Sequence, residues 1–201
     1  MLNLKKVAVT GGVSSGKTTV CRILEDHGAF QVSSDEIIHQ LLSLNTICIE
    51  QVTNLLGSEI IKDEKIDRRK VAELVFSSEE KLRALEKILH PLLFEEIEKL
   101  YQKIKKLNKY SLFVVEMPLV QEIGKQTYFD IIISIISDEK LAKERFQNRG
   151  FSPHEYEERM RWQWLPKEKA KKAHFIITNN GSLSELNAEV ICLLKKITTN
   201  A

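Results

Sequence analysis

Apolar residues gather in five short runs in which hydrophobic side chains follow one another without polar alternation. Such runs are typical of parallel strands in a sheet that is covered on both faces. Helical segments separate most of them, and this alternation is typical of a doubly wound α/β fold. The sequence therefore predicts a five-stranded parallel sheet flanked by helices. Its strands are expected at Val7–Thr10, Phe30–Ser33, Leu112–Glu116, Ile131–Ile136 and Phe175–Thr178.

Residues that favour helix ends mark several helix boundaries. Gly28 stands where the predicted helix Lys17–His27 should stop, because glycine readily adopts the left-handed conformation that ends helices. Ser182 and Glu185 form a capping box, which predicts a last helix running to about Ile197. Two further helices of the alternating pattern are expected at Glu36–Leu44 and Asp138–Arg149.

The segment between the second and third strands, roughly Ile47–Asn108, shows no strand signal. We expect a helix over Asp67–Phe76, followed by a longer helical stretch that opens at a Ser77/Glu80 capping box. Pro91 lies inside this stretch and should break or kink it, because proline cannot supply the helical N–H group. The segment is therefore predicted to be an all-helical insertion that could wall a substrate pocket.

The overall composition narrows the classes of partner. The 30 basic and 28 acidic residues leave a net charge of +2, which gives no support to a general nucleic-acid or membrane-surface role. No stretch approaches the ~20 apolar residues of a membrane span, and the N-terminal apolar run is too short for a signal peptide. The cysteines lie far apart without a C-x-x-C pair, so we expect a cytoplasmic protein with neither a disulfide framework nor a cysteine metal site. They are Cys21, Cys48 and Cys192.

The strongest chemical signal is the segment Gly11–Thr18, which fits G-x-x-x-x-G-K-[ST] between a predicted strand and a predicted helix. Its glycines let backbone N–H groups surround phosphate oxygens, and the helix N-terminus adds positive potential. Lys17 can reach the β- and γ-phosphates of ATP, and the Thr18 hydroxyl can ligate Mg²⁺. We therefore predict ATP and Mg²⁺ as cofactors. The expected nucleotide contacts in this segment are Gly12, Val13, Ser14, Ser15, Gly16, Lys17, Thr18 and Thr19.

A phosphate-binding loop alone does not separate kinases from GTPases, motors and regulators. The chain leaves little room for the coupling elements of a motor, and it has no N-K-x-D motif of the G-protein type. A small-molecule kinase is therefore the leading class.

Asp35 follows the second strand, at the edge of the sheet where ligands bind. Its carboxylate could accept the proton of an acceptor hydroxyl, or it could only cap a helix starting at Glu36. The residues alone support these two interpretations equally.

The string T-G-G-V-S-S-G-K-T-T at Thr10–Thr19 resembles the T-G-G-I-G-S-G-K-S-T opening of dephospho-CoA kinases. Further segments are similar to that family in the same order, and the matches together span about Val7–Leu193. They are Ser33–Ile38 (family D-A-D-x-I-A), Asp67–Arg69 (L-D-R), Leu85–Pro91 (L-E-x-I-x-H-P), Pro118–Glu122 (P-L-L-x-E) and Thr178–Gly181 (D-N-N-G). Three positions depart from the family pattern: Ser14 replaces a glycine, and Ser33 and Thr178 replace aspartates.

The resemblance implies a P-loop kinase fold with a helical lid at about residues 146–172. Residues 1–46 and 110–201 would form the nucleotide-binding core, and 47–109 a helical insertion for the coenzyme moiety. The reaction would transfer the γ-phosphate of ATP to the ribose 3′-hydroxyl of dephospho-CoA, giving ADP and CoA in the last step of coenzyme A synthesis. The site residues that the resemblance implies are Asp35, Lys17 and Arg149 in catalysis, Asp35, Arg68 and His90 at the substrate, and Asn180 and Gly181 at the nucleotide.

The predicted lid carries the arginines Arg145, Arg149 and Arg159. Phosphoryl transfer spreads charge over the transferred oxygens, and arginines brought in by lid closure can stabilise that charge. Alternatively, these arginines belong to a solvated helix surface with salt bridges, because glutamates interleave with them at 155, 157 and 158.

Several aromatic and acidic residues leave a functional and a structural interpretation open. Trp162 and Trp164 could stack on a base or pack against the core. Glu116 and Glu122 could order Mg²⁺ through water, or they could form salt bridges. His90 lies in the insertion, where a structural or substrate-pocket role is favoured over catalysis.

Two other functions also remain open at this point. One is a small P-loop kinase acting on a nucleoside, a nucleotide or a sugar acid. The other is a regulatory or scaffold protein that binds nucleotide without turnover, although the presence of both Lys17 and Asp35 argues against it.

Overall fold

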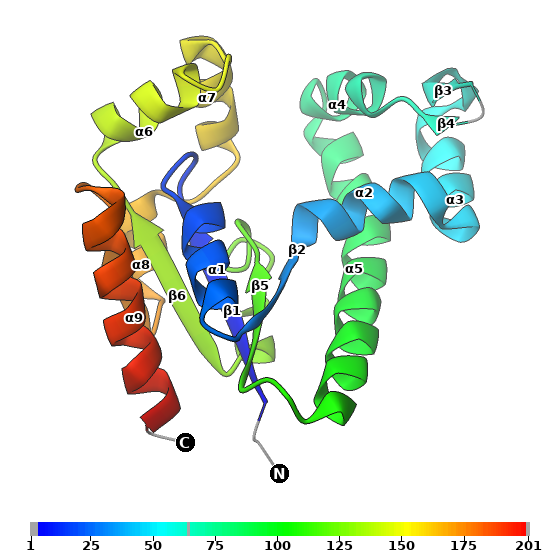
Figure 1. Ribbon diagram of the computed structural model, residues 1–201. Helices are drawn as coiled ribbons and strands as arrows, with labels where there is room; N and C mark the ends of the chain where they lie inside the picture. Colours follow the sequence, from blue (N-terminus) through cyan, green and yellow to red (C-terminus); the bar gives the residue numbers. More distant parts are fainter. Residues whose placement is uncertain (1–3, 64, 200–201) are drawn as a thin grey trace. The chain divides into compact units, whose positions relative to one another are not determined.

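The computed structural model describes residues 4–63 and 65–199, and the chain divides into two compact units (Figure 1). The first unit combines the chain up to Ser33 with the chain from Ile104 onward, and the second is the continuous segment Ser34–Lys103. The first unit is therefore assembled from both ends of the sequence. No helix within the described ranges is long and apolar enough to cross a membrane.

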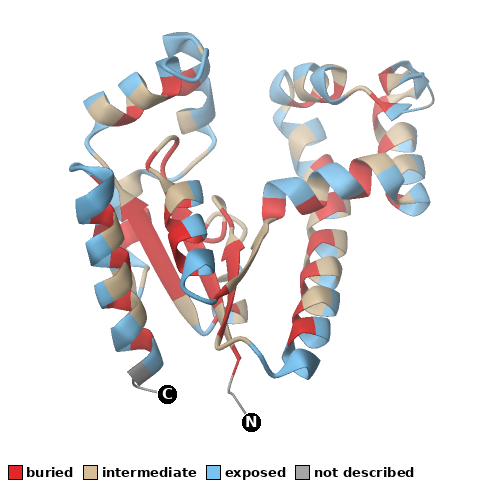
Figure 2. Ribbon diagram, in the orientation of Figure 1, coloured by how far each residue is buried: buried red, intermediate tan, exposed pale blue. Residues whose placement is uncertain are grey.

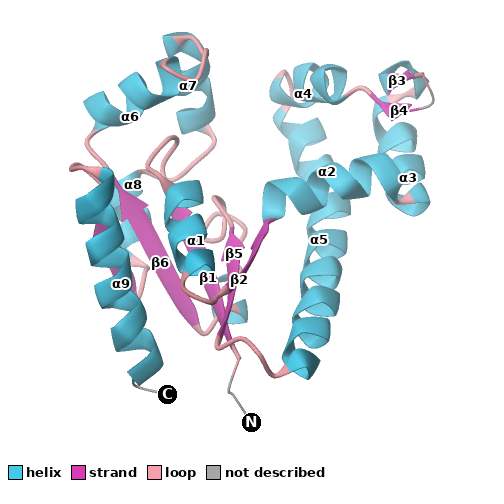
Figure 3. Ribbon diagram, viewed as in Figure 1, coloured by secondary structure: helices cyan, strands magenta, loops and turns pink. Residues whose placement is uncertain are grey.

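A five-stranded sheet in the order β2-β5-β1-β6-β7 forms the centre of the first unit, and each neighbouring pair is parallel (Figure 3). All five strands predicted from the apolar runs are confirmed. The first is longer than its apolar run, because Lys5 pairs with Leu112 and Gly11 pairs with Ile135. The strands are β1 (Lys5–Gly11), β2 (Phe30–Ser33), β5 (Leu112–Glu116), β6 (Ile131–Ile136) and β7 (Phe175–Thr178).

Helices cover this sheet. Helices α1 and α9 pack together over a core that includes Val9 and Ile133 of the sheet, and the short helix α8 contacts β6 and β1. Figure 2 shows the buried residues of the sheet and of the surrounding helices in red. This two-sided burial explains why the strands are apolar throughout. The helices of the unit are α1 (Lys17–Asp26), α6 (Glu139–Gln147), α7 (Pro153–Arg161), α8 (Pro166–Lys171) and α9 (Leu183–Thr199), with a 3₁₀ turn at Gln126–Tyr128.

Helix boundaries in the first unit follow their expected signals. Gly28 takes φ 90° just beyond α1 and donates its N–H to the Glu25 carbonyl, which ends the helix. The Ser182/Glu185 capping box is confirmed in both directions: Glu185 N–H donates to Ser182 Oγ over 3.2 Å, and Ser182 N–H donates to Glu185 Oε2 over 2.7 Å.

The second unit is mainly helical, but the expectation of an all-helical insertion is wrong. Ile61 pairs with Ile66 and Lys62 with Lys65 in a two-stranded antiparallel sheet. Strands of two residues are too short to leave an alternating pattern in the sequence. The elements are α2 (Ser34–Leu44), α3 (Thr46–Leu56), a 3₁₀ turn (Ser58–Ile60), β3 (Ile61–Lys62), β4 (Lys65–Ile66), α4 (Arg68–Phe76) and α5 (Glu79–Leu107), whose last residues enter the first unit.

Two expectations about α5 are corrected. The Ser77/Glu80 capping box is one residue out of place: Ser78 Oγ accepts the Lys81 N–H, while the Ser77 hydroxyl donates to a carbonyl at the end of α4. A break or kink was expected at Pro91, and the break does not occur, because α5 runs through this proline without interruption. The buried residues along the same helix explain its continuity, since their packing offsets the lost hydrogen bond; they are Leu85, Leu89, Leu93 and Ile97.

Candidate active site

The loop between β1 and α1 has the backbone shape that a phosphate-binding loop needs. Gly16, the N-cap of α1, takes φ 104°, and a Cβ there would lie 2.1 Å from Asn179 Nδ2. Only glycine fits this position without moving its neighbour. Ser14 also takes a positive φ, of 52°, so the serine that replaces a glycine of the family pattern accepts a left-handed conformation at some cost in strain.

The N-terminus of α1 adjoins this loop and has no side-chain cap. Gly16 supplies no side chain to cap the first N–H groups, and the first turn contains no acidic residue. The hydroxyl oxygens of Ser14 and Ser15 are buried and have no hydrogen-bond partner. Buried polar atoms normally find partners, and a phosphate would supply oxygens to both hydroxyls and to the helix end.

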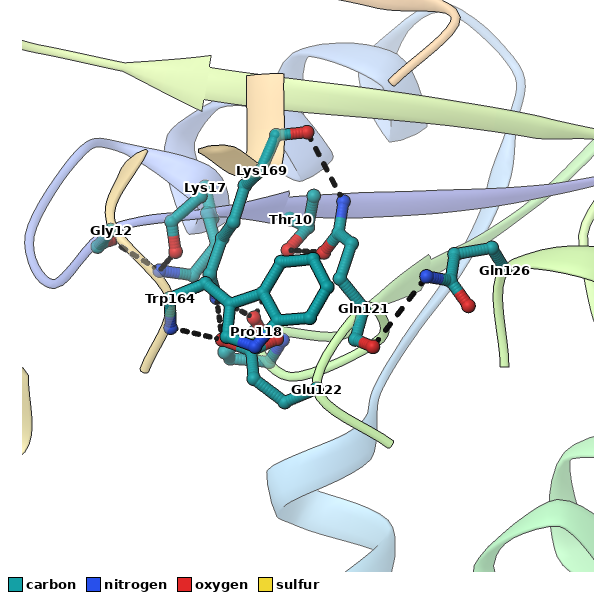
Figure 4. Close-up of polar contacts among 10 residues, drawn as sticks. Thr10, Gly12, Lys17, Pro118, Gln121, Glu122, Gln126, Trp164 and Lys169 are labelled. Carbon is teal, nitrogen blue, oxygen red and sulfur yellow. Dashed lines mark hydrogen bonds and ion pairs between the residues drawn. The ribbon is translucent and has the colours of Figure 1, made fainter. Parts of the chain in front are cut away.

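Lys17 lies across the same loop. Its side chain is buried, and Nζ donates to the Gly12 carbonyl over 2.8 Å and to the Gly11 carbonyl over 3.2 Å (Figure 4). These bonds hold the ammonium group over the concave side of the loop. The group is therefore placed to meet the negative charge of a phosphate bound there.

Two oxygen groups meet beside the loop. The Thr18 hydroxyl donates to Glu116 Oε1 over 2.9 Å. Glu116 is the last residue of β5, and it pairs in register with Ser33, the last residue of β2. A hydroxyl and a carboxylate are oxygen donors of the type that Mg²⁺ prefers. For Glu116, the structure thus shows a hydrogen bond to Thr18.

The loop after β7 closes the phosphate loop from outside. Asn179 Nδ2 donates to the Ser15 carbonyl over 2.8 Å, and the Asn179 carbonyl accepts from Arg145 Nη1 over 3.0 Å. The side chain of Asn180 accepts the Asp138 N–H over 2.8 Å. Sequence reasoning named Asn180, which lines the cavity beside the phosphate loop, but it missed Asn179, which holds the loop itself. Gly181 follows them at the start of the turn into α9.

A cavity of about 620 Å³ lies beside the phosphate loop within the first unit. Its volume suits a small-molecule ligand, and its walls are mainly apolar. The phosphate loop, the ends of β6 and β7, and helices α6, α7 and α8 all contribute to it. Lining residues include Gly12, Val13, Asp138, Tyr156, Pro166 and Asn180.

The three lid arginines occupy different surroundings. Arg145 contacts the loop that holds the phosphate loop. Arg149 is exposed just after α6. The Arg159 guanidinium stacks over Phe151 and Phe146, at 4.8 Å and 5.2 Å from the ring centres.

The interleaved glutamates have partners other than these arginines. Glu155 caps α7 with Ser152, Glu157 pairs with Lys143, and Glu158 pairs with His154. The lid surface is thus not a simple alternation of arginine–glutamate salt bridges.

Functional and structural interpretations were open for the two tryptophans and for Glu122, and the structure bears on each of them. Trp162 and Trp164 are 40% and 41% exposed, so neither is packed into the core. Glu122 Oε1 forms an ion pair of 2.7 Å with Lys169 and accepts the Trp164 N–H over 2.8 Å. For Glu122, the salt-bridge interpretation is therefore the one that the structure shows.

The predicted substrate residues lie in the second unit. Asp35 is exposed in the first turn of α2, and because this helix begins at Ser34, Asp35 is not its N-cap. Arg68 is the exposed first residue of α4, and His90 is half-buried in α5. The capping interpretation of Asp35 is therefore wrong.

Comparisons with known proteins agree on one family. The family model described as dephospho-CoA kinase matches residues 5–185. A dephospho-CoA kinase of Protochlamydia amoebophila is 45% identical over 188 residues, which cover 92% of this chain and 93% of the relative. A solved dephospho-CoA kinase from Campylobacter jejuni is 30% identical with a TM-score of 0.73 and 98% of each chain covered. A solved Thermus thermophilus protein is 27% identical with a TM-score of 0.82, covering 98% of this chain and 99% of that one.

Proposed function

Because the chain belongs to the dephospho-CoA kinase family, we propose that it transfers the γ-phosphate of ATP to the ribose 3′-hydroxyl of dephospho-CoA, giving CoA and ADP. The observation that carries this proposal is the family match over residues 5–185, which includes a formed phosphate-binding loop with Lys17 lying across it. The reaction is the last step of coenzyme A synthesis.

The phosphates of ATP bind, in this proposal, inside the loop Gly12–Thr19. Backbone N–H groups at the start of α1 and the unpartnered hydroxyls of Ser14 and Ser15 support this assignment. Lys17 stabilises the negative charge on the transferred phosphoryl group. The base and ribose take the adjacent cavity of about 620 Å³, where Asn180 forms part of the wall and Gly181 follows it.

Mg²⁺ fits the oxygen donors beside the loop. Thr18 Oγ1 would ligate the ion, and Glu116, which accepts the hydrogen bond of this hydroxyl, would hold it in orientation. When bound, Mg²⁺ neutralises charge on the β- and γ-phosphate oxygens.

Asp35 is proposed to accept the proton of the acceptor hydroxyl. It follows Ser33 by two residues along the chain, and Ser33 is paired with Glu116 at the carboxyl end of the sheet. Its carboxylate is exposed and is not occupied as an N-cap, so it remains available to a substrate. The match of Asp35 to the second aspartate of the family segment supports the same role.

The substrate insertion at 47–109 is proposed to bind the coenzyme moiety. The exposed guanidinium of Arg68, the first residue of α4, suits the diphosphate of dephospho-CoA, because arginine forms strong hydrogen bonds with phosphate oxygens. His90 stands in the L-E-x-I-x-H-P segment of α5 and is proposed to line the same site.

The lid arginines Arg145, Arg149 and Arg159 are proposed to stabilise the phosphoryl group when the lid is closed, with Arg149 taking part in catalysis. The role of Arg145 is supported by its hydrogen bond to the Asn179 carbonyl, since Asn179 also holds the phosphate loop.

The reaction is proposed to take place in the cytoplasm, which agrees with the three free cysteines.

A coupled ADP-release assay tests the proposed function. Dephospho-CoA is offered beside adenosine, nucleotides and gluconate at equal concentration, with ATP and Mg²⁺ present. We expect turnover with dephospho-CoA to exceed turnover with each other acceptor. Faster turnover of a nucleoside, a nucleotide or a sugar acid, or no ADP release with any acceptor, would contradict the proposal.

A further inference from the structure

A buried ion pair joins the lid to the loop after β5. Lys169 of α8 is 0% exposed and Glu122 is 13% exposed, and 2.7 Å separates Lys169 Nζ from Glu122 Oε1. Lys169 Nζ also donates to the Pro118 carbonyl. A lysine is almost never fully buried unless it is paired, so this position is specified by its partners (Figure 4).

The same pair belongs to a network that reaches the phosphate loop. Glu122 Oε1 accepts the Trp164 N–H over 2.8 Å, so one carboxylate oxygen holds both ends of the segment 164–169. Gln121 Nε2 donates to the Lys169 carbonyl over 3.4 Å. The Thr10 hydroxyl, next to the phosphate loop, lies 3.2 Å from Gln121 Oε1 and 3.0 Å from the Pro118 carbonyl.

Helix α8 in turn covers the phosphate loop. A Cβ on Gly12 would lie 2.9 Å from Pro166 Cγ, so the first turn of α8 is in close contact with the loop backbone. Leu165, Pro166 and Lys167 line the nucleotide cavity together with Gly12. A displacement of α8 therefore changes the shape of the cavity next to the phosphates.

Stability alone does not account for this pair. Burial lowers the pKa of Lys169 even though the nearby Glu122 carboxylate favours its charged form. Taking both charges out of water is costly, and replacing a buried ion pair by uncharged side chains of similar volume is often neutral for stability. An apolar residue in place of Lys169 would remove the Nζ donor that joins α8 to the Pro118 carbonyl and to Glu122.

We propose that Lys169 is a positioning residue of the phosphoryl transfer, acting through Glu122. The pair fixes α8 and the backbone at Trp164 against the phosphate loop, and thereby keeps the nucleotide cavity in the shape that aligns the transferred group. Lys169 contacts neither substrate nor nucleotide in this role. The inference rests on the proposed function, which it deepens at the same site.

The test separates positioning from folding with three variants. Lys169→Met and Glu122→Gln each remove one charge and leave the other without its partner, so both should lower the melting temperature. The double variant carries no buried charge and should regain the parental melting temperature to within a few degrees. Lys171→Met is the matched control, because Lys171 lies on the same helix in an exposed pair with Glu168.

Rates are measured at a temperature at which every variant is folded. We expect kcat with dephospho-CoA to stay at least ~10-fold below the parent in the double variant, because small misplacements of reacting groups are costly. Lys171→Met should stay within about twofold of the parent. A double variant that regains both the melting temperature and the parental kcat would overturn the inference, since Lys169 would then serve only the fold.

A further variant covers the case in which the double variant does not fold. Glu122→Asp keeps both charges but withdraws the carboxylate by one methylene group. A folded Glu122→Asp protein with kcat reduced ~10-fold supports the positioning role. A folded Glu122→Asp protein with parental kcat overturns it.

Hydrogen exchange keeps this inference distinct from the proposed function. If the parent protein does not turn over dephospho-CoA, the proposed function is contradicted. The inference is then decided by the amide hydrogen exchange of residues 164–169, measured while a non-hydrolysable ATP analogue is bound. We expect the analogue to protect this segment less in the double variant than in the parent. Equal protection in the two proteins would overturn the positioning role.

Discussion

Asn179 donates its side-chain amide to the carbonyl oxygen of Ser15 over 2.8 Å, and so joins the loop after β7 to the turn that precedes α1. The same amide lies 2.1 Å from the point where a Cβ on Gly16 would stand. The strand at one edge of the sheet therefore controls the shape of a loop that follows its central strand. Arg145 of α6 donates to the Asn179 carbonyl, which extends the connection to that helix.

Gly16→Ala should both destabilise the protein and weaken ATP binding. The positive φ costs about 1–2 kcal/mol, and displacing Asn179 adds about 1 kcal/mol for the lost hydrogen bond. Gly28→Ala is the matched control, because Gly28 also has a positive φ but a Cβ there meets nothing within 4 Å. Urea unfolding and ATP titration are measured on both. Equal losses of stability and unchanged ATP affinity in both would contradict the role given to the Gly16–Asn179 contact.

Lys17→Ala should reduce kcat by at least about 10²–10³-fold while the protein stays folded. The ammonium group faces the transferred charge, and its loss acts mainly in the transition state. Turnover is measured beside circular dichroism on one preparation. Near-parental turnover would refute the assignment of Gly11–Thr18 as the phosphate site.

Removal of Mg²⁺ with a chelator should abolish turnover, and its return should restore it. Thr18→Val keeps the shape of the side chain but removes the hydroxyl that contacts Glu116. We expect this variant to need about 10-fold more Mg²⁺ for half-maximal rate. A Mg²⁺ titration of both proteins gives this number, and superimposable curves would rule out Thr18 as a ligand.

Asp35→Asn should lower kcat by about 10²–10⁴-fold, because an amide cannot take the proton of the hydroxyl. Its effect on stability should be limited to the loss of one negative charge in the first turn of α2, about 0.3–1 kcal/mol. Glu36→Gln removes a charge from the same turn and is the control. If both variants turn over at the parental rate, the mechanism needs another base.

Alanine at Arg149 or Arg159 should lower kcat more than it weakens ATP binding, because the clamp acts on the transferred group. Arg159→Ala should also loosen the lid, since the guanidinium stacks on two rings. Arg161, exposed at the end of α7, provides the control. Kinetics and ATP titration are compared for the three variants. Small, equal changes in both quantities would favour a solvated surface without a catalytic role.

The central strands were predictable because burial on both faces dictates runs of apolar residues, and β2, β5, β6 and β7 begin and end at the predicted residues. The phosphate loop was predictable because backbone geometry demands glycines at fixed spacing. Contacts that depend on tertiary packing were not predictable from the sequence. Lys169 lies in a run of charged residues, Pro-Lys-Glu-Lys-Ala-Lys, which is indistinguishable in sequence from a solvated helix face.

Dependence on tertiary packing also explains the other differences between the predicted and the observed structure. Whether Asn179 or Asn180 faces the phosphate loop depends on the direction of two adjacent side chains at the end of β7, which the N-N-G string does not encode. The continuity of α5 through Pro91 depends on packing against neighbours far along the chain. Local rules for proline describe the missing hydrogen bond but not the contacts that offset it.

The order of strands in the sheet has a consequence for how the protein is made on the ribosome. β1 lies between β5 and β6, so the strand that precedes the phosphate loop has no partner until the chain has passed Glu116. The segment Ser34–Lys103 is continuous and is synthesised completely within this interval. At ~5–20 residues per second, the nascent β1 waits roughly 5–20 s for its first neighbour. The nucleotide site, although encoded near the start of the chain, is therefore among the last parts of the protein to form.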